Sequence, residues 1–140
     1  MIELRHVTKR YGAVEALHDV SFRAPEGQIV GLLGQNGAGK STMLNAIAGV
    51  FQVDTGKILI DGVDVTALPE YKRAKYIGRV FQDPMMGTAA TMQIEENLAL
   101  AARRGKPRTL RPGITKADRE FYKEQLRILD LGLEDRMTTK

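Results

Sequence analysis

The chain has 140 residues, with 43% hydrophobic and 27% charged side chains, a formal net charge of +4 and no cysteine. This length is typical of about one domain, and the composition excludes a disordered, collagen-like or disulfide-stabilised small protein. The apolar runs are much shorter than the roughly 20 residues of a membrane span, and the N-terminus lacks the apolar stretch of a secretory signal.

The first two predicted elements are strands. Residues 2–10 alternate apolar and polar side chains, which is typical of a half-buried strand, and Tyr11-Gly12 ends the pattern. Residues 14–24 resume it, and a Pro-Glu-Gly sequence marks the next turn. We therefore predict two antiparallel strands at the start of the chain.

A continuous apolar run follows these strands. Residues 28–33 (QIVGLL) are typical of a strand buried on both faces, as in a parallel sheet. The glycine-rich residues 34–39 then lead into residues 40–48, whose apolar side chains recur at helical spacing. Gly49 is the predicted end of this helix.

The middle of the chain predicts a hairpin and a further short strand. Residues 57–61 and 63–65 flank Asp61-Gly62, the strongest short-range signal for a hairpin turn. Residues 77–82 (IGRVFQ) predict the short strand.

The last third of the chain predicts two helices. Residues 94–103 place apolar side chains on one helical face, and residues 106–113, which contain two prolines, predict a surface loop. Thr115 and Asp118 match a capping box at the start of the second helix. Its predicted packing stripe is Tyr122, Leu126, Leu129 and Leu133.

The glycine-rich segment matches a phosphate-binding pattern. It satisfies G-x-x-x-x-G-K-[ST] between an apolar run and a helix, with the residues Gly34, Gln35, Asn36, Gly37, Ala38, Gly39, Lys40 and Ser41. The glycines tolerate positive φ and let backbone N–H groups converge on an anion. The helix N-terminus adds partial positive charge. We expect Lys40 to reach the β- and γ-phosphates, Ser41 to bind Mg²⁺, and Thr42 to donate near the α-phosphate.

Two further residues are candidates for the same site. Tyr11 ends a predicted strand, where its ring either stacks on a purine or packs in the core. Gln82 precedes Asp83 and a proline, where its amide either touches Mg²⁺ and water or simply belongs to a turn. The residues alone leave both alternatives open.

The motifs together resemble the ATP-binding subunit of an ABC transporter. LLGQNGAGKSTML, with YG upstream and VFQDP downstream, carries the resemblance, and HVTKRYG, ALHDVSF, GKILIDG and IEENL extend it over nearly the whole chain. The resemblance implies an α/β P-loop NTPase fold with an antiparallel β subdomain and P-loop core in residues 1–90 and the start of a helical subdomain in residues 91–140. It also implies that ATP and Mg²⁺ are the cofactors, that Tyr11 stacks on adenine, and that Gln82 senses Mg²⁺ and contacts membrane subunits.

Several parts of that family's machinery are missing from this sequence. It has no L-S-G-G-Q signature, no apolar strand ending in Asp-Glu and no switch histidine; Asp61 imitates a metal-binding Asp but is followed by Gly62 in the predicted hairpin. By resemblance, the chain is the front part of a longer protein with an incomplete parallel sheet. We therefore expect Mg-ATP binding with negligible hydrolysis, and self-association or local disorder at apolar strands that lack neighbours.

One position departs from the family pattern. The family usually has Ser or Thr where Gln93 stands, and Gln is a weak N-cap. Thr91 is therefore an alternative start for the helix over residues 94–103.

The leading function is ATP-coupled solute transport. The resemblance implies membrane permease subunits and a second ATP-binding subunit as partners, with the chain in the cytoplasm on the inner face of the cell membrane. Residues 1–102 carry 10 basic and 11 acidic side chains, whereas residues 103–140 carry 11 and 6, net +5. This basic region is the only support for the alternative of an ABC ATPase acting on nucleic acid or ribosomes, so no nucleic-acid partner is expected. A P-loop GTPase is disfavoured because no N-K-x-D motif occurs.

Overall fold

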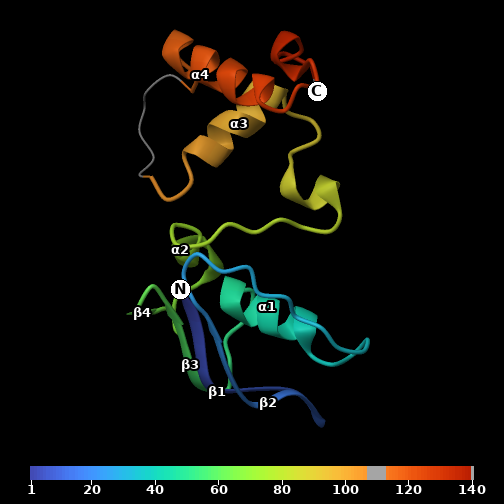
Figure 1. Cartoon of the computed structure of the whole chain (residues 1–140), viewed down its shortest axis with the longest axis vertical. Helices are drawn as coiled ribbons and strands as arrows, with labels where there is room; N and C mark the ends of the chain where they lie inside the picture. The colour runs from blue at the N-terminus through green and yellow to red at the C-terminus, as the bar shows by residue number, and fades with distance from the viewer. Residues whose placement is uncertain (107–112, 140) are drawn as a thin grey trace. The chain divides into compact units, whose positions relative to one another are not determined.

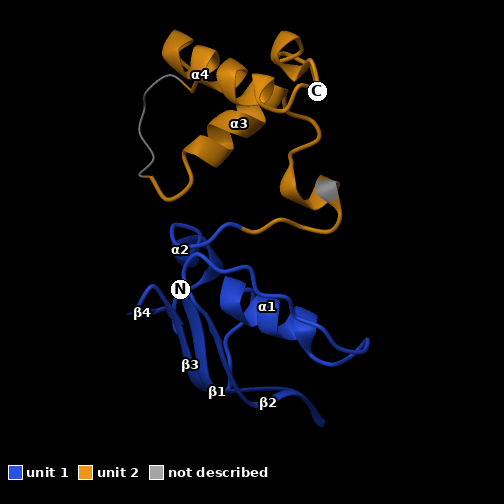
Figure 2. Cartoon of the chain, viewed as in Figure 1, with its two compact units in different colours: residues 1–78 blue, residues 79–140 orange. Residues whose placement is uncertain are grey.

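The computed structural model describes residues 1–106 and 113–139, so most of the loop predicted over residues 106–113 lies outside the described residues. The chain divides into two compact units, Met1–Gly78 and Arg79–Lys140 (Figure 2). In the described part of the chain, no helix has the length and apolar character needed to cross a membrane.

The first unit contains a four-stranded antiparallel sheet (Figure 1). Its strands are β1 (Ile2–Tyr11), β2 (Val14–Ala24), β3 (Thr55–Ile60) and β4 (Val63–Asp64), in the order β2-β1-β3-β4. Ile2 pairs with Ala24 of β2 and with Ile60 of β3, so β1 is central between them. The predicted pair of N-terminal strands and the predicted hairpin are both confirmed.

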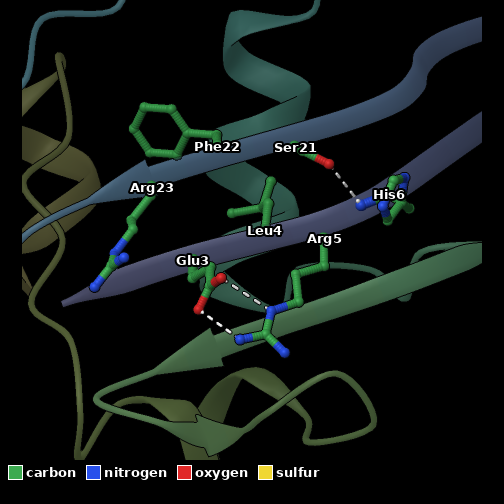
Figure 3. A pocket seen from close by; sticks show the side chains of 7 residues that line it. All are labelled: Glu3, Leu4, Arg5, His6, Ser21, Phe22 and Arg23. Atoms are coloured by element: carbon green, nitrogen blue, oxygen red, sulfur yellow. Dashed lines mark hydrogen bonds and ion pairs between the residues drawn. The ribbon is translucent and has the colours of Figure 1, made fainter.

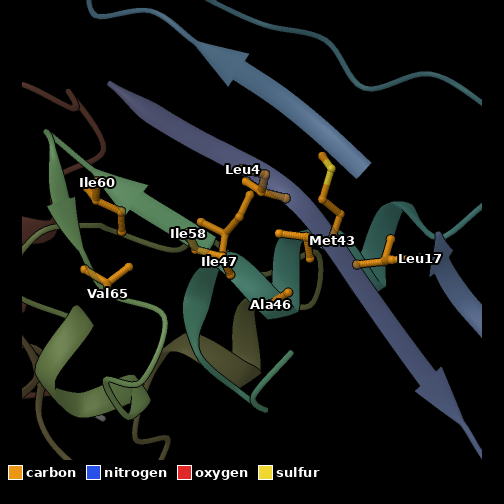
Figure 4. Close-up of a cluster of buried hydrophobic side chains, with 9 residues drawn as sticks. Leu4, Leu17, Met43, Ala46, Ile47, Ile58, Ile60 and Val65 are labelled. Atoms are coloured by element: carbon orange, nitrogen blue, oxygen red, sulfur yellow. The ribbon is translucent and has the colours of Figure 1, made fainter. Parts of the chain in front are cut away.

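Helix α1 (Lys40–Ala48) packs its buried side chains against this sheet (Figure 4). The helix ends at Gly49, whose φ of 84° is left-handed, as predicted for a helix stop. The shared core combines strand and helix residues: Leu4, Val7, Leu17, Met43, Ala46, Ile47, Ile58, Ile60 and Val65.

A buried arginine joins the end of α1 to the short helix α2 (Glu70–Arg73). Arg73 is 1% exposed. Its guanidinium donates to the carbonyls of Ala46 and Ile47 in the last turn of α1, and to those of Thr66 and Leu68, at 2.7–3.0 Å. Burial lowers the pKa of this side chain from its usual value. The charge thus satisfies carbonyls that a helix end otherwise leaves without partners.

Two predicted strands are not formed. Residues 28–33 and 77–82 have no strand structure, and Ile29, Leu33 and Val80 are 104%, 94% and 97% exposed. A strand is stable only when neighbouring strands pair with its backbone and cover its side chains. Within the described residues, the sheet provides neither segment with such a partner. The apolar runs have strand-like composition but do not form strands.

The second unit is helical. It contains the 3₁₀ turns η1 (Pro84–Gly87) and η2 (Leu133–Asp135) and the helices α3 (Ile94–Ala102) and α4 (Lys116–Arg127). Its core is formed by Ala99, Tyr122, Leu126 and Met137. The prediction that Leu129 belongs to the packing stripe is wrong, because α4 ends at Arg127 and Leu129 is 55% exposed.

Side chains fix both helix starts of this unit. The Thr115 hydroxyl accepts from the Asp118 N–H, and the Asp118 carboxylate accepts from the Thr115 N–H at 2.9 Å, which confirms the capping box. The N-cap of α3 is Gln93, not Thr91. The Glu96 carboxylate accepts from the Gln93 N–H at 2.7 Å, so an acidic side chain in the first turn compensates for a weak N-cap.

Candidate functional site

The glycine-rich loop enters α1 through a position that only glycine can fill. Gly39, the residue before α1, has a φ of 79°. A Cβ built there would lie 2.6 Å from the Ala16 carbonyl oxygen of β2. Gly37 has a φ of 86°, with nothing within 4 Å of a Cβ. The sequence predicted both positive φ angles, but not the close approach of β2, which fixes the loop against the sheet.

Lys40 closes the loop onto itself. Its Nζ donates to the carbonyl oxygens of Gly34 at 2.7 Å and Gln35 at 2.6 Å. The Ala38 N–H donates to the Gln35 carbonyl at 3.2 Å, which adds a turn inside the same loop. An ammonium has three N–H donors, and these two bonds hold it at the loop without neutralising its charge. The arrangement presents a fixed cation beside the exposed residues 34–38.

The start of α1 adds a second source of positive potential. The first N–H groups of a helix have no acceptor within the helix, and the first turn of α1 contains no acidic side chain. The Met43 N–H makes the first helical bond, to the Gly39 carbonyl at 2.8 Å. Ser41 is exposed and Thr42 half-buried, so both hydroxyl-bearing residues lie at this helix end. The loop, Lys40 and the helix end together form an anion-binding geometry.

Tyr11 lies at the end of β1 with 49% of its surface exposed. Its ring packs edge-to-face with Phe51, with the centroids 5.8 Å apart and the planes at 82°. The Lys9 Nζ lies 5.5 Å from the Tyr11 ring centroid. Neither alternative for Tyr11 is decided by this packing, because the ring is partly packed and partly open. Strand alternation predicts that Lys9 and Tyr11 share a face, but no local signal in the sequence indicates Phe51.

Gln82 belongs to the second unit, four residues after the boundary, and is exposed. The Asp83 carboxylate accepts from the Met85 N–H at 2.9 Å at the start of η1, so a 3₁₀ turn directly follows Gln82. Tyr11 and the loop lie in the first unit, whereas Gln82 lies in the second.

Two other features of the first unit are a carboxylate at the β3–β4 turn and a hollow on the sheet. Asp61, with φ 50°, and Gly62 form the β3–β4 turn, and the Asp61 carboxylate pairs with the N-terminal ammonium, as expected for a hairpin rather than a metal ligand. A shallow hollow over β1 and β2 is lined by a mixture of basic, acidic, hydroxyl and apolar side chains (Figure 3). Arg5 in this hollow donates two bonds to Glu3, at 2.9 and 3.0 Å, and the bonded guanidinium lowers the pKa of Glu3.

Comparison with known proteins identifies the family. The profile of the ABC transporter family matches residues 17–139. The tyrosine transport ATP-binding protein of Clostridioides difficile is 39% identical over 111 residues, covering 76% of this chain and 44% of that protein. The sulfate/thiosulfate import ATP-binding protein CysA of Acinetobacter baylyi is 38% identical over 130 residues, covering 93% of this chain and 34% of that protein.

A solved structure gives the same result for the fold. The dimeric structure of the ATP-binding cassette MJ0796 bound to ADP and Pi superposes with a TM-score of 0.77 and 30% identity, covering 100% of this chain and 61% of that chain. The chain thus spans less than half the length of the two curated relatives and less than two thirds of the solved cassette. Its fold is similar to part of an ATP-binding cassette, and the chain belongs to the ABC transporter family.

Proposed function

We propose that the protein binds Mg-ATP and acts as the nucleotide-binding component of an ABC transporter, which couples ATP hydrolysis to solute transport through separate membrane subunits. The observation that carries this proposal is the Lys40 ammonium, held by the Gly34 and Gln35 carbonyls at the start of α1. The two sequence relatives are named as transport and import ATP-binding proteins, and the related cassette binds ADP and Pi. These names favour transport over the alternative role on nucleic acid or ribosomes.

Each predicted site residue has a role in this proposal. The backbone N–H groups of residues 34–42 surround the phosphates, Lys40 contacts the β- and γ-phosphates, and the Tyr11 ring stacks on the adenine. The Ser41 hydroxyl would hold Mg²⁺, because it is a hard oxygen donor. The role of Gln82 at Mg²⁺ stays an expectation from the family resemblance. The bound ion would supply positive charge to the β- and γ-phosphate oxygens.

The chain is proposed to bind ATP without sustained turnover. The signature sequence, the Asp-Glu strand and the switch histidine, which the resemblance assigns to hydrolysis, are missing from the sequence. The related cassette is dimeric, and we propose a second ATP-binding subunit as the partner that completes the site. Sustained ATP hydrolysis by this chain alone would contradict this part of the proposal, provided that Lys40→Ala abolishes the hydrolysis.

Membrane subunits are the second proposed partner, with the protein peripheral on the cytoplasmic face of the membrane. The second unit holds an apolar groove of about 620 Å³ between η1 and α3, lined among others by Met85, Met92, Ile94 and Leu98. It lies a few residues beyond Gln82 in the sequence, the residue that the family resemblance assigns to this contact. An apolar groove of this kind can receive the apolar face of a helix from a partner protein.

The test is thermal unfolding with and without Mg-ATP. A ligand at a hundred times its dissociation constant stabilises the native state by about 2.7 kcal/mol, so the unmodified chain should melt at a higher temperature with Mg-ATP. Lys40→Ala should abolish most of this shift, because it removes a charge-assisted phosphate contact of about 1.5–3 kcal/mol. Lys57→Ala, which removes an exposed lysine of β3, is the control and should keep it. An equal shift in all three proteins would refute the proposed site.

A further inference from the structure

Lys9 is a partly buried cation held by fixed acceptors. Its side chain is only 14% exposed. The Nζ donates to the Gln52 carbonyl at 2.9 Å and to the Asp54 Oδ1 at 3.1 Å. A lysine on an exposed strand end usually extends into water, so this ammonium is held in place by interactions beyond simple solvation.

Asp54 is itself anchored to β1. Its Oδ2 accepts the Arg10 N–H at 2.7 Å, and its own N–H donates to the Thr8 carbonyl at 3.0 Å. The backbone bond from Arg10, together with Lys9, lowers the pKa of the Asp54 carboxyl, so the carboxylate stays charged beside the ammonium. The Lys9 Nζ is therefore held by a backbone carbonyl and by a carboxylate that is itself bonded to the backbone of β1.

The same ammonium faces two aromatic rings. It lies 5.5 Å from the centroid of Tyr11 and 5.3 Å from that of Phe51, both within cation–π range. Phe51 contacts Tyr11 edge-to-face at 5.8 Å. Tyr11 is thereby restrained by a cation and by a second ring, while 49% of its surface stays open.

We propose that Lys9 and Phe51 are positioning residues that hold the Tyr11 ring as a preformed platform for a nucleobase. A ring that is already fixed loses less conformational freedom when a base stacks on it, so binding is tighter. Their effect therefore falls on the base and not on the phosphates, and the pair sets how strongly the site prefers a nucleoside triphosphate over a bare triphosphate. This inference rests on the proposed ATP site and on base stacking by Tyr11.

The test compares dissociation constants for Mg-ATP and Mg-tripolyphosphate. Lys9→Met, which keeps the length and removes the charge, should weaken ATP binding about three- to tenfold, as expected for a partly desolvated cation–π contact. Tripolyphosphate binding should not change. Lys9→Arg, which keeps a cation, should retain the preference for ATP. A purely structural role would instead weaken both ligands together.

Matched variants separate this inference from the proposed function. Lys75→Met removes another cation–π lysine, 4.6 Å from the Tyr76 ring, and should leave both constants unchanged. Phe51→Leu removes the second ring and should lower the preference for ATP; it decides the matter if Lys9→Met fails to fold. An unchanged preference in the folded variants, while Tyr11→Ala lowers it, overturns the role of Lys9 and Phe51 alone. If Lys40→Ala leaves ATP binding intact, the proposed function fails instead.

Discussion

Two adjacent segments of the first unit behave in opposite ways. Residues 34–48 form the loop and helix that the sequence predicts, whereas residues 28–33, just before them, remain without strand structure. Both segments are rich in small or apolar residues, so composition does not explain the difference. The loop and helix find their partners within the described chain, and the apolar run does not. The geometry of the phosphate-binding loop is therefore present although residues 28–33 do not form a strand.

The partners of the loop and helix can be named. At one end, Gly39 lies against the Ala16 carbonyl of β2; at the other, Arg73 binds the last carbonyls of α1. Between them, Met43 and Ile47 are buried in the core. The loop and α1 therefore depend on contacts at both ends and along the buried face of the helix.

The largest effect is expected for Arg73→Met. This change keeps a long apolar stem but removes the guanidinium donor from four buried or partly buried backbone carbonyls, of which that of Ala46 keeps a second donor, the Gly49 N–H. Each buried unsatisfied acceptor costs about 1–3 kcal/mol, with partial relief by local movement, so the free energy of unfolding should fall by about 3–5 kcal/mol. Urea unfolding measures it, and the exposed Arg23→Met is the control. A loss below about 1 kcal/mol would show that α1 does not depend on this arginine.

Gly39→Ala should come next. A left-handed φ costs a non-glycine residue about 1–2 kcal/mol, and the new Cβ would lie 2.6 Å from the Ala16 oxygen. We expect a total loss of about 2–4 kcal/mol in the free energy of unfolding, together with loss of Mg-ATP binding. Gly37→Ala is the matched control: its φ is also positive, but its Cβ meets nothing within 4 Å, so only the cost of about 1–2 kcal/mol applies. Equal losses would mean that contact with β2 is unimportant.

A smaller effect is expected in the second unit, which has its own internal support. The Glu95 carboxylate, 7% exposed, accepts two bonds from Arg119, at 2.7 and 2.8 Å, and joins α3 to α4. The guanidinium lowers the pKa of Glu95 below its usual 4.5. The bond therefore stabilises the unit fully above that pH, and the stabilisation is lost as the pH falls through the lowered value.

Glu95→Gln tests this support. It should cost about 1–2 kcal/mol near pH 7, since a charge-assisted pair becomes a neutral hydrogen bond, and it should flatten the fall in stability on acidification. Urea unfolding followed through the NMR signals of the α3 and α4 amides, at pH 7 and in mild acid, gives both quantities. Glu120→Gln, which removes an exposed partner of Lys123, is the control. An acid profile that is identical with and without Glu95 would contradict the assignment.

The sequence predicted the parts of the fold that depend on local chemistry. The turn at Asp61-Gly62, the helix stop at Gly49 and the capping box at Thr115 are all formed as expected, because each is decided by a few neighbouring residues. The sequence missed what depends on distant partners: the four carbonyls around Arg73 and the ring of Phe51 beside Tyr11. For the same reason it placed strands at residues 28–33 and 77–82, where the pattern is that of a strand but the described part of the chain offers no neighbouring strand.

The smallest effect is expected in residues 28–33, the apolar segment that forms no strand. Leu33 is 94% exposed, so Leu33→Lys should change the free energy of unfolding by less than about 0.5 kcal/mol, as at other surface positions. Ile58→Lys is the matched control, because Ile58 lies in β3 and is 0% exposed; burying its charge should cost more than about 3 kcal/mol. Light scattering of Leu33→Lys should also show less self-association, since an added charge blocks pairing of an apolar segment. If Leu33→Lys proved as costly as Ile58→Lys, residues 28–33 would have to be paired inside a sheet, and the phosphate loop would then depend on that strand after all.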